Sequence, residues 1–298
     1  MEENKYIADH LYVTRKLTEL ERSYPFIKTQ RLGQSIAGRD ITGLVFGKAE
    51  QYVLYAGAFH GAEWLTAALL LEFASELADA VASNEQIAGV PARRALSGRG
   101  LILIPAVNPD GCEISIHGAA GAGHYAASVH RISGGNYSSY SANARGVDIN
   151  HNFDAGWETL HKLEQKAGIY GPAPRRYGGR RPESEPETRA ITALCRERNI
   201  LHALAFHAQG EVIYWDYGKH TPPKSRKLAE ILASSSGYAL EKPEGLAVGG
   251  GFKDWFIQAF SRPAFTIEIG RGENPLPPET LPDIYSRLRE MMMFALML

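Results

Sequence analysis

The residues of this chain whose types and spacing point most directly to chemistry are His60 and Glu63, three positions apart. They stand between residues 53–59, an apolar run typical of a strand, and residues 64–77, where apolar side chains recur at helical spacing without Gly or Pro. If the first helical turn begins near His60, the imidazole and the carboxylate share one face and can bind one metal ion. Zinc accepts both donor types, and a hydrolytic zinc site takes three protein ligands and keeps one position open for water. A third ligand must therefore lie elsewhere in the chain.

The same spacing also arises by chance, in which case His60 is a helix-start residue beside a solvated Glu63. The position after a strand favours metal binding, because open α/β sheets bind ligands at the carboxyl ends of their strands. Two more polar residues, His207 and Glu268, stand in short apolar segments typical of buried strands. A lone histidine there is more often a hydrogen-bonded core residue. A carboxylate is almost never fully buried unless it is paired or bound to a metal, so Glu268 indicates a cation or a catalytic role.

Hydrophobic periodicity predicts the elements that must position these side chains. Strands are expected at residues 41–46, 51–59, 100–107, 202–207 and 264–269. Helices are expected at residues 9–24, 64–83, 188–198, 223–235, 253–260 and 282–298. Turns or loops are expected at residues 36–39, 108–111, 117–146 and 168–186. The alternation predicts one domain over residues 1–298, with an α/β fold in three α/β/α layers around a mixed, mainly parallel sheet.

Composition excludes several other classes of protein. The chain has 298 residues, 44% of them hydrophobic, which is enough for a large core, and its net charge of −1 gives no support for nucleic-acid binding. The first ten residues lack the pattern of a secretory signal, and the apolar residues 291–298 are too few to span a membrane. Two cysteines are too few for a disulfide framework or a cysteine zinc site. We therefore expect reduced cysteines, a cytoplasmic location and no membrane partner.

Over residues 24–298 the chain resembles the zinc metallocarboxypeptidases of the carboxypeptidase A type. Five segments occur in the order found in that family: His60-Gly-Ala-Glu63-Trp64, Asn108-Pro-Asp-Gly111, Gly146-Val-Asp-Ile-Asn150, His207, and Thr266-Ile-Glu268. The resemblance implies one zinc ion held by His60, Glu63 and His207, which is the ligand set of carboxypeptidase A itself. It also implies that Glu268 is the general base, beside the metal without ligating it. Asp148 would orient His60 through its second ring nitrogen; a turn or a helix cap is the alternative for Asp148.

Several positions depart from the pattern of the family. Its exopeptidases bind the terminal carboxylate of the substrate with an Asn-Arg pair, whereas this chain has Asn150 followed by His151 and lacks that guanidinium. For the arginine that faces the oxyanion the resemblance offers Arg131 and Arg145, of which Arg145 is preferred. Ala62 and Leu246 stand where an arginine and a tyrosine are usual. Trimming of ordinary protein C-termini is therefore not the expected activity.

The remaining segments are similar to those of the bacterial γ-D-glutamyl-diamino acid peptidases, which cut the bond from γ-D-glutamate to meso-diaminopimelate in peptidoglycan peptides. They are residues 184–190, 206–215, 253–257 and 266–270, with Asn274-Pro after them. Lys253 lies 15 residues before Glu268, at the position that forms the base of the side-chain pocket in the family. A cation there would suit the second carboxylate of diaminopimelate; a solvated lysine at a helix start is the alternative. The expected partner is thus a peptide, a muropeptide that contains diaminopimelate.

Two other functions compete with this hypothesis. One is a zinc carboxypeptidase or amidohydrolase that acts on other C-terminal acidic residues or on N-acyl groups. The other is a catalytically inactive binding module that keeps the zinc fold, which the intact metal residues and Glu268 argue against. The basic residues 175–181 could contact an anionic muropeptide, although a solvated loop is the favoured interpretation.

Overall fold

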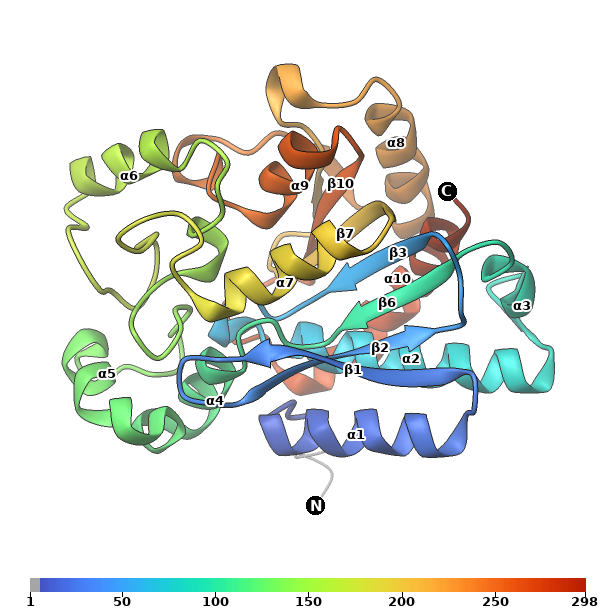
Figure 1. Cartoon of the computed structure of the whole chain (residues 1–298), viewed down its shortest axis with the longest axis horizontal. Coiled ribbons are helices and arrows are strands. Elements are labelled where there is room, and N and C mark those ends of the chain that lie inside the picture. Colours follow the sequence, from blue (N-terminus) through green and yellow to red (C-terminus); the bar gives the residue numbers. More distant parts are fainter. Residues whose placement is uncertain (1–5) are drawn as a thin grey trace.

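The computed structural model describes residues 6–298, and its framework is a mixed eight-stranded sheet in the order β1-β2-β6-β3-β7-β10-β8-β9 (Figure 1). The central neighbours β6, β3, β7 and β10 run parallel, and the antiparallel pairs are β1-β2, β2-β6 and β10-β8. The strands are β1 (Ile27–Gln34), β2 (Asp40–Phe46), β3 (Tyr52–Ala56), β6 (Gly100–Ile104), β7 (Ile200–Ala208), β8 (Val212–Tyr214), β9 (Ala239–Glu241) and β10 (Ala264–Ile269). A separate hairpin joins β4 (Gln86–Ile87) to β5 (Val90–Pro91).

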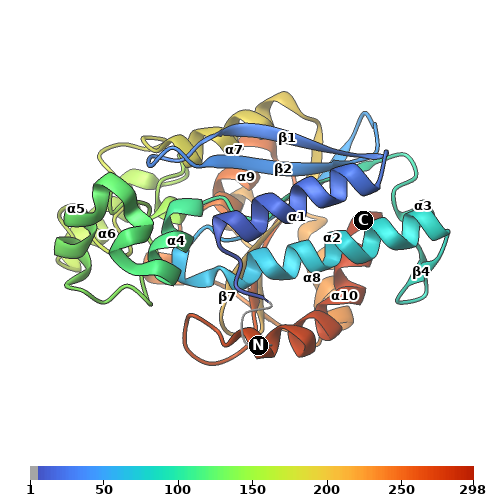
Figure 2. The same ribbon diagram turned by 90° about the horizontal axis from the view of Figure 1, so that it is seen from below.

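Helices cover both faces of this sheet. One hydrophobic core lies under α1 (His10–Ser23), α2 (Leu65–Ser83), α8 (Ser225–Ser236) and α10 (Leu281–Met297). A second core lies under α7 (Pro186–Glu197) and α9 (Phe252–Phe260) on the opposite face. In Figure 2, α1 and α2 lie below the ribbon of β1 and β2, and α7 lies above it. The expected three-layer α/β fold is confirmed.

The central strands are apolar because they are covered on both sides. Every residue of β3 and β6 is buried, which explains why their sequences are continuous hydrophobic runs rather than alternating ones. The methionines 291–293 of α10 are also fully buried, so the apolar end of the chain forms a core helix, as expected. Cys112 and Cys195 are buried free thiols. Among the described residues, no helix is long and apolar enough to cross a membrane.

The sequence-based expectations fail mainly between the strands. Residues 117–146, expected to be a loop, contain α5 (Ala126–Ser133), and α6 (Trp157–Lys166) was not foreseen. The expected turn at Asn108 is instead the start of α4 (Pro109–His117), because the Asn108 side chain accepts a hydrogen bond from the Gly111 N–H at 2.9 Å. A capping residue followed by proline fits a helix start as well as a turn. The first five residues, part of the segment without a signal pattern, lie outside the described residues.

The segments that differ most from expectation gather at one end of the sheet. Figure 1 shows α4, α5 and α6 at the end toward which β3 and β6 point. Because β3, β7 and β10 are parallel neighbours, their carboxyl ends meet at this edge. The Cα atoms of His207 and Glu268 are register partners there, and His60 lies four residues past the end of β3. The topology thereby brings polar residues together that lie more than a hundred positions apart in sequence.

Candidate metal centre and active site

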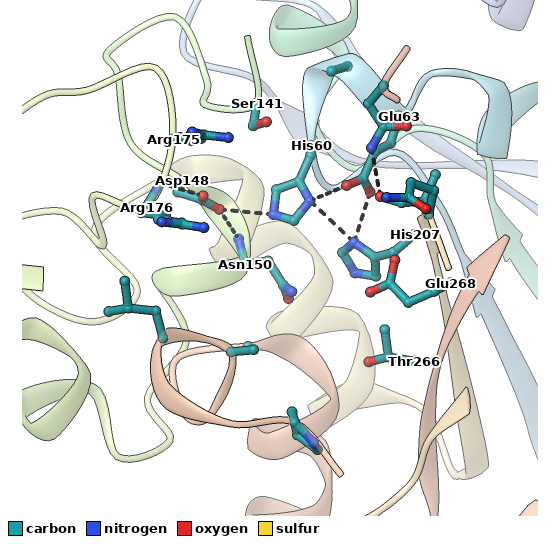
Figure 3. Close-up of a pocket in the computed structure, with 18 of the residues that line it drawn as sticks. His60, Glu63, Ser141, Asp148, Asn150, Arg175, Arg176, His207, Thr266 and Glu268 are labelled. Atoms are coloured by element: carbon teal, nitrogen blue, oxygen red, sulfur yellow. Dashed lines mark hydrogen bonds and ion pairs between the residues drawn. The ribbon is translucent and has the colours of Figure 1, made fainter. Parts of the chain in front are cut away.

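Three side chains converge at the carboxyl edge of the sheet. The Nδ1 atom of His60 lies 2.8 Å from Glu63 Oε1, and the Nδ1 atom of His207 lies 2.9 Å from Glu63 Oε2. The two Nδ1 atoms are 3.3 Å apart (Figure 3). The three residues can each turn one ligand atom toward a common point, with these atoms within 4.8 Å of one another.

This donor set fits a divalent metal ion. Two imidazole nitrogens and a carboxylate are ligands that zinc prefers, and two ring nitrogens that face each other need a shared cation or proton between them. The second ring nitrogen of His60, Nε2, lies 3.1 Å from Asp148 Oδ1, so His60 can donate there and keep Nδ1 free for a metal. His207 Nε2 is buried without a hydrogen-bond partner.

Local backbone structure sets the distance between His60 and Glu63. His60 has an extended backbone (φ −105°, ψ 139°) and is the N-cap residue of a 3₁₀ turn at Gly61–Glu63. The sequence analysis considered a helical turn that begins near His60; in the structure His60 directly precedes the turn. The turn packs so tightly that a Cβ atom on Gly61 would lie 2.2 Å from the carbonyl oxygen of Gly111. Thr66 then donates to the carbonyl of Glu63 at 2.8 Å and fixes the entry into α2. The glycine between the two metal-site residues is therefore a steric requirement.

Asp148 links the metal centre to the pocket wall. Its Oδ1 accepts from His60 and from the Asn150 N–H at 3.1 Å, and its Oδ2 accepts from the Arg176 N–H at 2.7 Å. Burial by itself would raise the pKa of this carboxyl group, but the charges of His60 and His151 and these hydrogen bonds hold the pKa well below its usual range. Asp148 therefore contacts His60 as an acceptor, which is the placement that the implied orienting role requires, and it also caps the short 3₁₀ turn Ile149–His151.

Glu268 lies beside the three metal-site residues without joining their cluster. Its side chain lines the same pocket and makes no hydrogen bond or ion pair with the residues that the structure describes. Burial, and then the negative charge of Glu63, raise the pKa of Glu268 to about 8. A bound cation would oppose both effects and favour the carboxylate. A carboxyl group free of protein partners next to a metal centre has the placement that a general base needs.

The three metal-site residues, together with Asp148 and Glu268, line a pocket of about 870 Å³. Asn150, His151 and Lys253, for which the sequence analysis predicted substrate binding, also line this pocket. Lys253 is not a solvated residue: it is buried, donates to the carbonyl oxygen of Asp216 at 2.8 Å and forms an ion pair with Asp254. Its charge is therefore already balanced inside the protein.

The two arginines expected to face the substrate lie away from the pocket. Arg145 is paired with Glu185 at 2.8 Å, and Arg131 lies on α5; neither lines the pocket. Arg175 and Arg176 line it instead, on the side of His60 where Asp148 lies (Figure 3). Neither guanidinium group has a hydrogen bond or ion pair with any part of the chain that the structure describes. The sequence analysis considered that the basic residues 175–181 could contact an anionic muropeptide but favoured a solvated loop; in the structure, Arg175 and Arg176 of this loop line the pocket.

Arg176 is also held in an unusual backbone conformation. Its φ of 66° is left-handed, which is costly for a residue other than glycine. The hydrogen bond from its N–H to Asp148 secures this conformation. Strain of this kind persists where the surrounding structure fixes it, and here it directs one of two unpaired arginines to the wall beside His60.

Comparison with known proteins agrees with this geometry. The family model described as zinc carboxypeptidase matches residues 13–291. The chain belongs to the zinc carboxypeptidase family. It is therefore a hydrolase of the zinc peptidase class, and its metal-binding residues follow the pattern His60-x-x-Glu63…His207.

Among its relatives, a protein from Lysinibacillus sphaericus named γ-D-glutamyl-L-diamino acid endopeptidase 1 is 35% identical over 279 residues. The match covers 93% of this chain and 69% of the relative. The fold is similar to bovine thrombin-activatable fibrinolysis inhibitor in complex with tick carboxypeptidase inhibitor, with a TM-score of 0.75 at 18% identity, covering 99% and 98% of the two chains. It is also similar to carboxypeptidase A from Helicoverpa armigera, with a TM-score of 0.73 at 20% identity, covering 96% and 72%. The two structures establish the fold alone.

Proposed function

We propose that this zinc carboxypeptidase homologue hydrolyses the bond between γ-D-glutamate and meso-diaminopimelate in peptidoglycan peptides. The observation that carries the proposal is the pocket beside the metal centre. It lacks the usual Asn-Arg pair but contains two unpaired arginines, Arg175 and Arg176, together with His151. Such a pocket suits a substrate with several carboxylates, because guanidinium groups bind carboxylates through charge-assisted hydrogen bonds. The relative from Lysinibacillus sphaericus supports the same bond type.

Each residue of the site would have a separate role in the hydrolysis. His60, Glu63 and His207 would hold one zinc ion, which supplies a Lewis acid that activates water and polarises the scissile carbonyl. Glu268 would accept a proton from the attacking water on its carboxylate and pass that proton to the leaving amine of the diamino acid. Asp148 would keep His60 oriented through the reaction.

Arg175 and Arg176 would bind the carboxylates of the substrate or the oxyanion that develops at the carbonyl. They take the place that the sequence analysis gave to Arg145. Both arginines come from the same loop as Arg180 and Arg181, which are exposed and do not line the pocket. This loop therefore offers matched controls, since all four substitutions remove one charge from one segment.

The test compares two substrates with the same C-terminal residue. Zinc-loaded protein is given L-Ala-γ-D-Glu-meso-diaminopimelate or its α-linked isomer, and release of diaminopimelate is followed by mass spectrometry. We expect the γ-linked peptide to be cleaved at least about 100-fold more efficiently, and Arg176→Ala to lower this rate by about 10- to 100-fold, the range for one charge-assisted contact. Arg181→Ala should change it by less than about twofold. Faster cleavage of the α-linked peptide would instead indicate an ordinary carboxypeptidase, and release of an N-acyl group from a blocked amino acid would indicate an amidohydrolase.

A further inference from the structure

Arg175 and Arg176 stand on a loop whose backbone is fixed on both sides of them. The Asp148 N–H donates to the carbonyl oxygen of Tyr177 at 2.8 Å, and Asp148 Oδ2 accepts from the Arg176 N–H at 2.7 Å. The carbonyl oxygen of Pro174 accepts from two backbone N–H groups of the segment that precedes Asp148, each at 2.9 Å. The points from which the two side chains extend are therefore fixed, although no group of residues 6–298 pairs with either guanidinium.

These two arginines supply the free positive charge of the pocket. The lysines and arginines that line it are Arg175, Arg176 and Lys253, and Lys253 is buried and paired with Asp254. The two arginines are exposed, and no carboxylate in the described part of the chain forms an ion pair with them. A guanidinium group presents its N–H donors as a rigid fork that matches the two oxygens of a carboxylate. A carboxylate of the substrate therefore finds its unpaired partners at this place in the pocket.

The position of the arginines relative to Glu268 indicates which part of the substrate they face. Figure 3 shows the two arginines beside Asp148, on one side of His60, and Glu268 beside His207, on the other side. In the proposed reaction Glu268 passes a proton to the leaving amine, so the leaving residue lies toward Glu268. The residue on the acyl side of the scissile bond then extends away from Glu268, toward the arginines.

We propose that Arg175 and Arg176 bind the free carboxylate of the glutamate on the acyl side of the scissile bond, and that the enzyme discriminates against peptides in which this carboxylate is a primary amide. The inference rests on the proposed function and decides between the two roles that it leaves open for these arginines. A carboxylate offers two oxygens to two forked donors, whereas the oxyanion is a single oxygen. A primary amide has one acceptor oxygen and turns an NH₂ donor toward the guanidinium donors.

This contact does not depend on which linkage is cleaved. In the γ-linked peptide, the free carboxylate of glutamate is separated from the scissile carbonyl by two methylene groups and the α-carbon. In the α-linked isomer, the same three carbons separate the side-chain carboxylate from the scissile carbonyl. The contact with the arginines can therefore be tested on either isomer.

The test compares L-Ala-γ-D-Glu-meso-diaminopimelate with the same peptide in which the free carboxylate of glutamate is a primary amide. The zinc-loaded wild-type protein should cleave the acid with a kcat/KM at least about 10-fold higher than that for the amide. Arg176→Ala should lower kcat/KM for the acid by about 10- to 100-fold, mainly through KM, because a hydrogen bond between charged groups is lost. It should change the amide by less than about threefold. Arg175→Ala combined with Arg176→Ala should bring the two substrates within about threefold of each other.

The matched control is the double variant Arg180→Ala with Arg181→Ala. It removes the same two charges from the same loop, at exposed positions that do not line the pocket. It should leave both substrates within about threefold of the wild type, and so it separates a direct contact from long-range attraction of an anionic peptide. Arg176→Ala keeps the backbone N–H that donates to Asp148, so bound zinc and thermal unfolding should not change in that variant.

Equal losses on acid and amide in Arg176→Ala would overturn the inference and assign this arginine to the oxyanion, which forms from both peptides. A wild-type protein that does not prefer the acid, or a control double variant with the same loss, would also overturn it. The α-linked acid and its amide are assayed in parallel. Faster cleavage of the α-linked pair refutes the γ-D-glutamyl assignment, while the acid-to-amide comparison on that pair still tests the two arginines. Cleavage of none of the four peptides by the wild-type protein would overturn both proposals.

Discussion

Asp148 offers the sharpest test of how the metal centre is supported, through the substitution Asp148→Asn. The carboxylate accepts from His60 and Asn150 on Oδ1 and from the Arg176 N–H on Oδ2, so all three partners are donors. An asparagine has one acceptor oxygen and one donor group. It best serves the two donors at Oδ1, which leaves its NH₂ facing the N–H of Arg176.

The expected magnitudes follow from this geometry. A hydrogen bond to a charged group contributes about 1.5–3 kcal/mol and a neutral one about 0.5–1.5 kcal/mol. The substitution therefore weakens the hydrogen bond that orients His60 by about 1–1.5 kcal/mol. This difference weakens zinc binding by about 10-fold, at the low end of the roughly 10- to 100-fold range for residues that orient a metal ligand. The facing donors at Arg176 add about 1 kcal/mol of destabilisation, because that N–H is left unpaired in a half-buried place.

Zinc affinity is measured by competition with a chromophoric chelator, and the free energy of unfolding by urea denaturation of the metal-free protein. Glu185→Gln is the matched control: Glu185 is also a buried carboxylate that accepts several hydrogen bonds, including those from Asn143 and Arg145, but it lies outside the pocket. It should lower stability and leave zinc affinity unchanged. An Asp148→Asn protein that binds zinc as tightly as the wild type would refute the role of Asp148 in orienting His60.

Three further outcomes are expected. Glu268→Gln should lower turnover by about 10²- to 10⁴-fold, the usual contribution of a general base, with bound zinc measured by atomic absorption unchanged; retained turnover would contradict the assignment. Lys253→Met should destabilise the fold by about 3–5 kcal/mol in urea because it leaves Asp254 buried and unpaired, and the double variant with Asp254→Asn should recover at least half of this loss. Burial, and then the charge of Asp110, raise the pKa of Glu187 from 4.5 to about 8, so the folded state retains a proton that the unfolded state releases, and stability should fall as pH rises through that window. Glu187→Gln should reduce this fall by up to about 4 kcal/mol between pH values near 5 and 9; equal pH dependence in both proteins would show that Glu187 ionises normally.

The sequence by itself determined the framework of this protein and its family. Continuous apolar runs identified the buried strands, and helical recurrence located α2 and α10, because burial on two faces or on one stripe leaves a local pattern. The spacing of His60 and Glu63 predicted a metal pair, and the isolated polar residues His207 and Glu268 in apolar segments indicated the rest of the centre. The predictions of fold class, family and hydrolase activity are confirmed.

Only the tertiary structure decided which residues form the walls around that centre. Arg175 and Arg176 belong to a segment without apolar periodicity, so nothing local distinguishes them from solvated residues. Their positions depend on how the chain between β6 and β7 folds back over the carboxyl edge of the sheet, through contacts such as that of Arg176 with Asp148. Arg145 shows the converse, since its place in the sequence suggested the pocket and a buried Glu185 holds it elsewhere. The metal-binding pattern is encoded in short spacings and strand ends, whereas the walls of the pocket depend on long-range packing of loops.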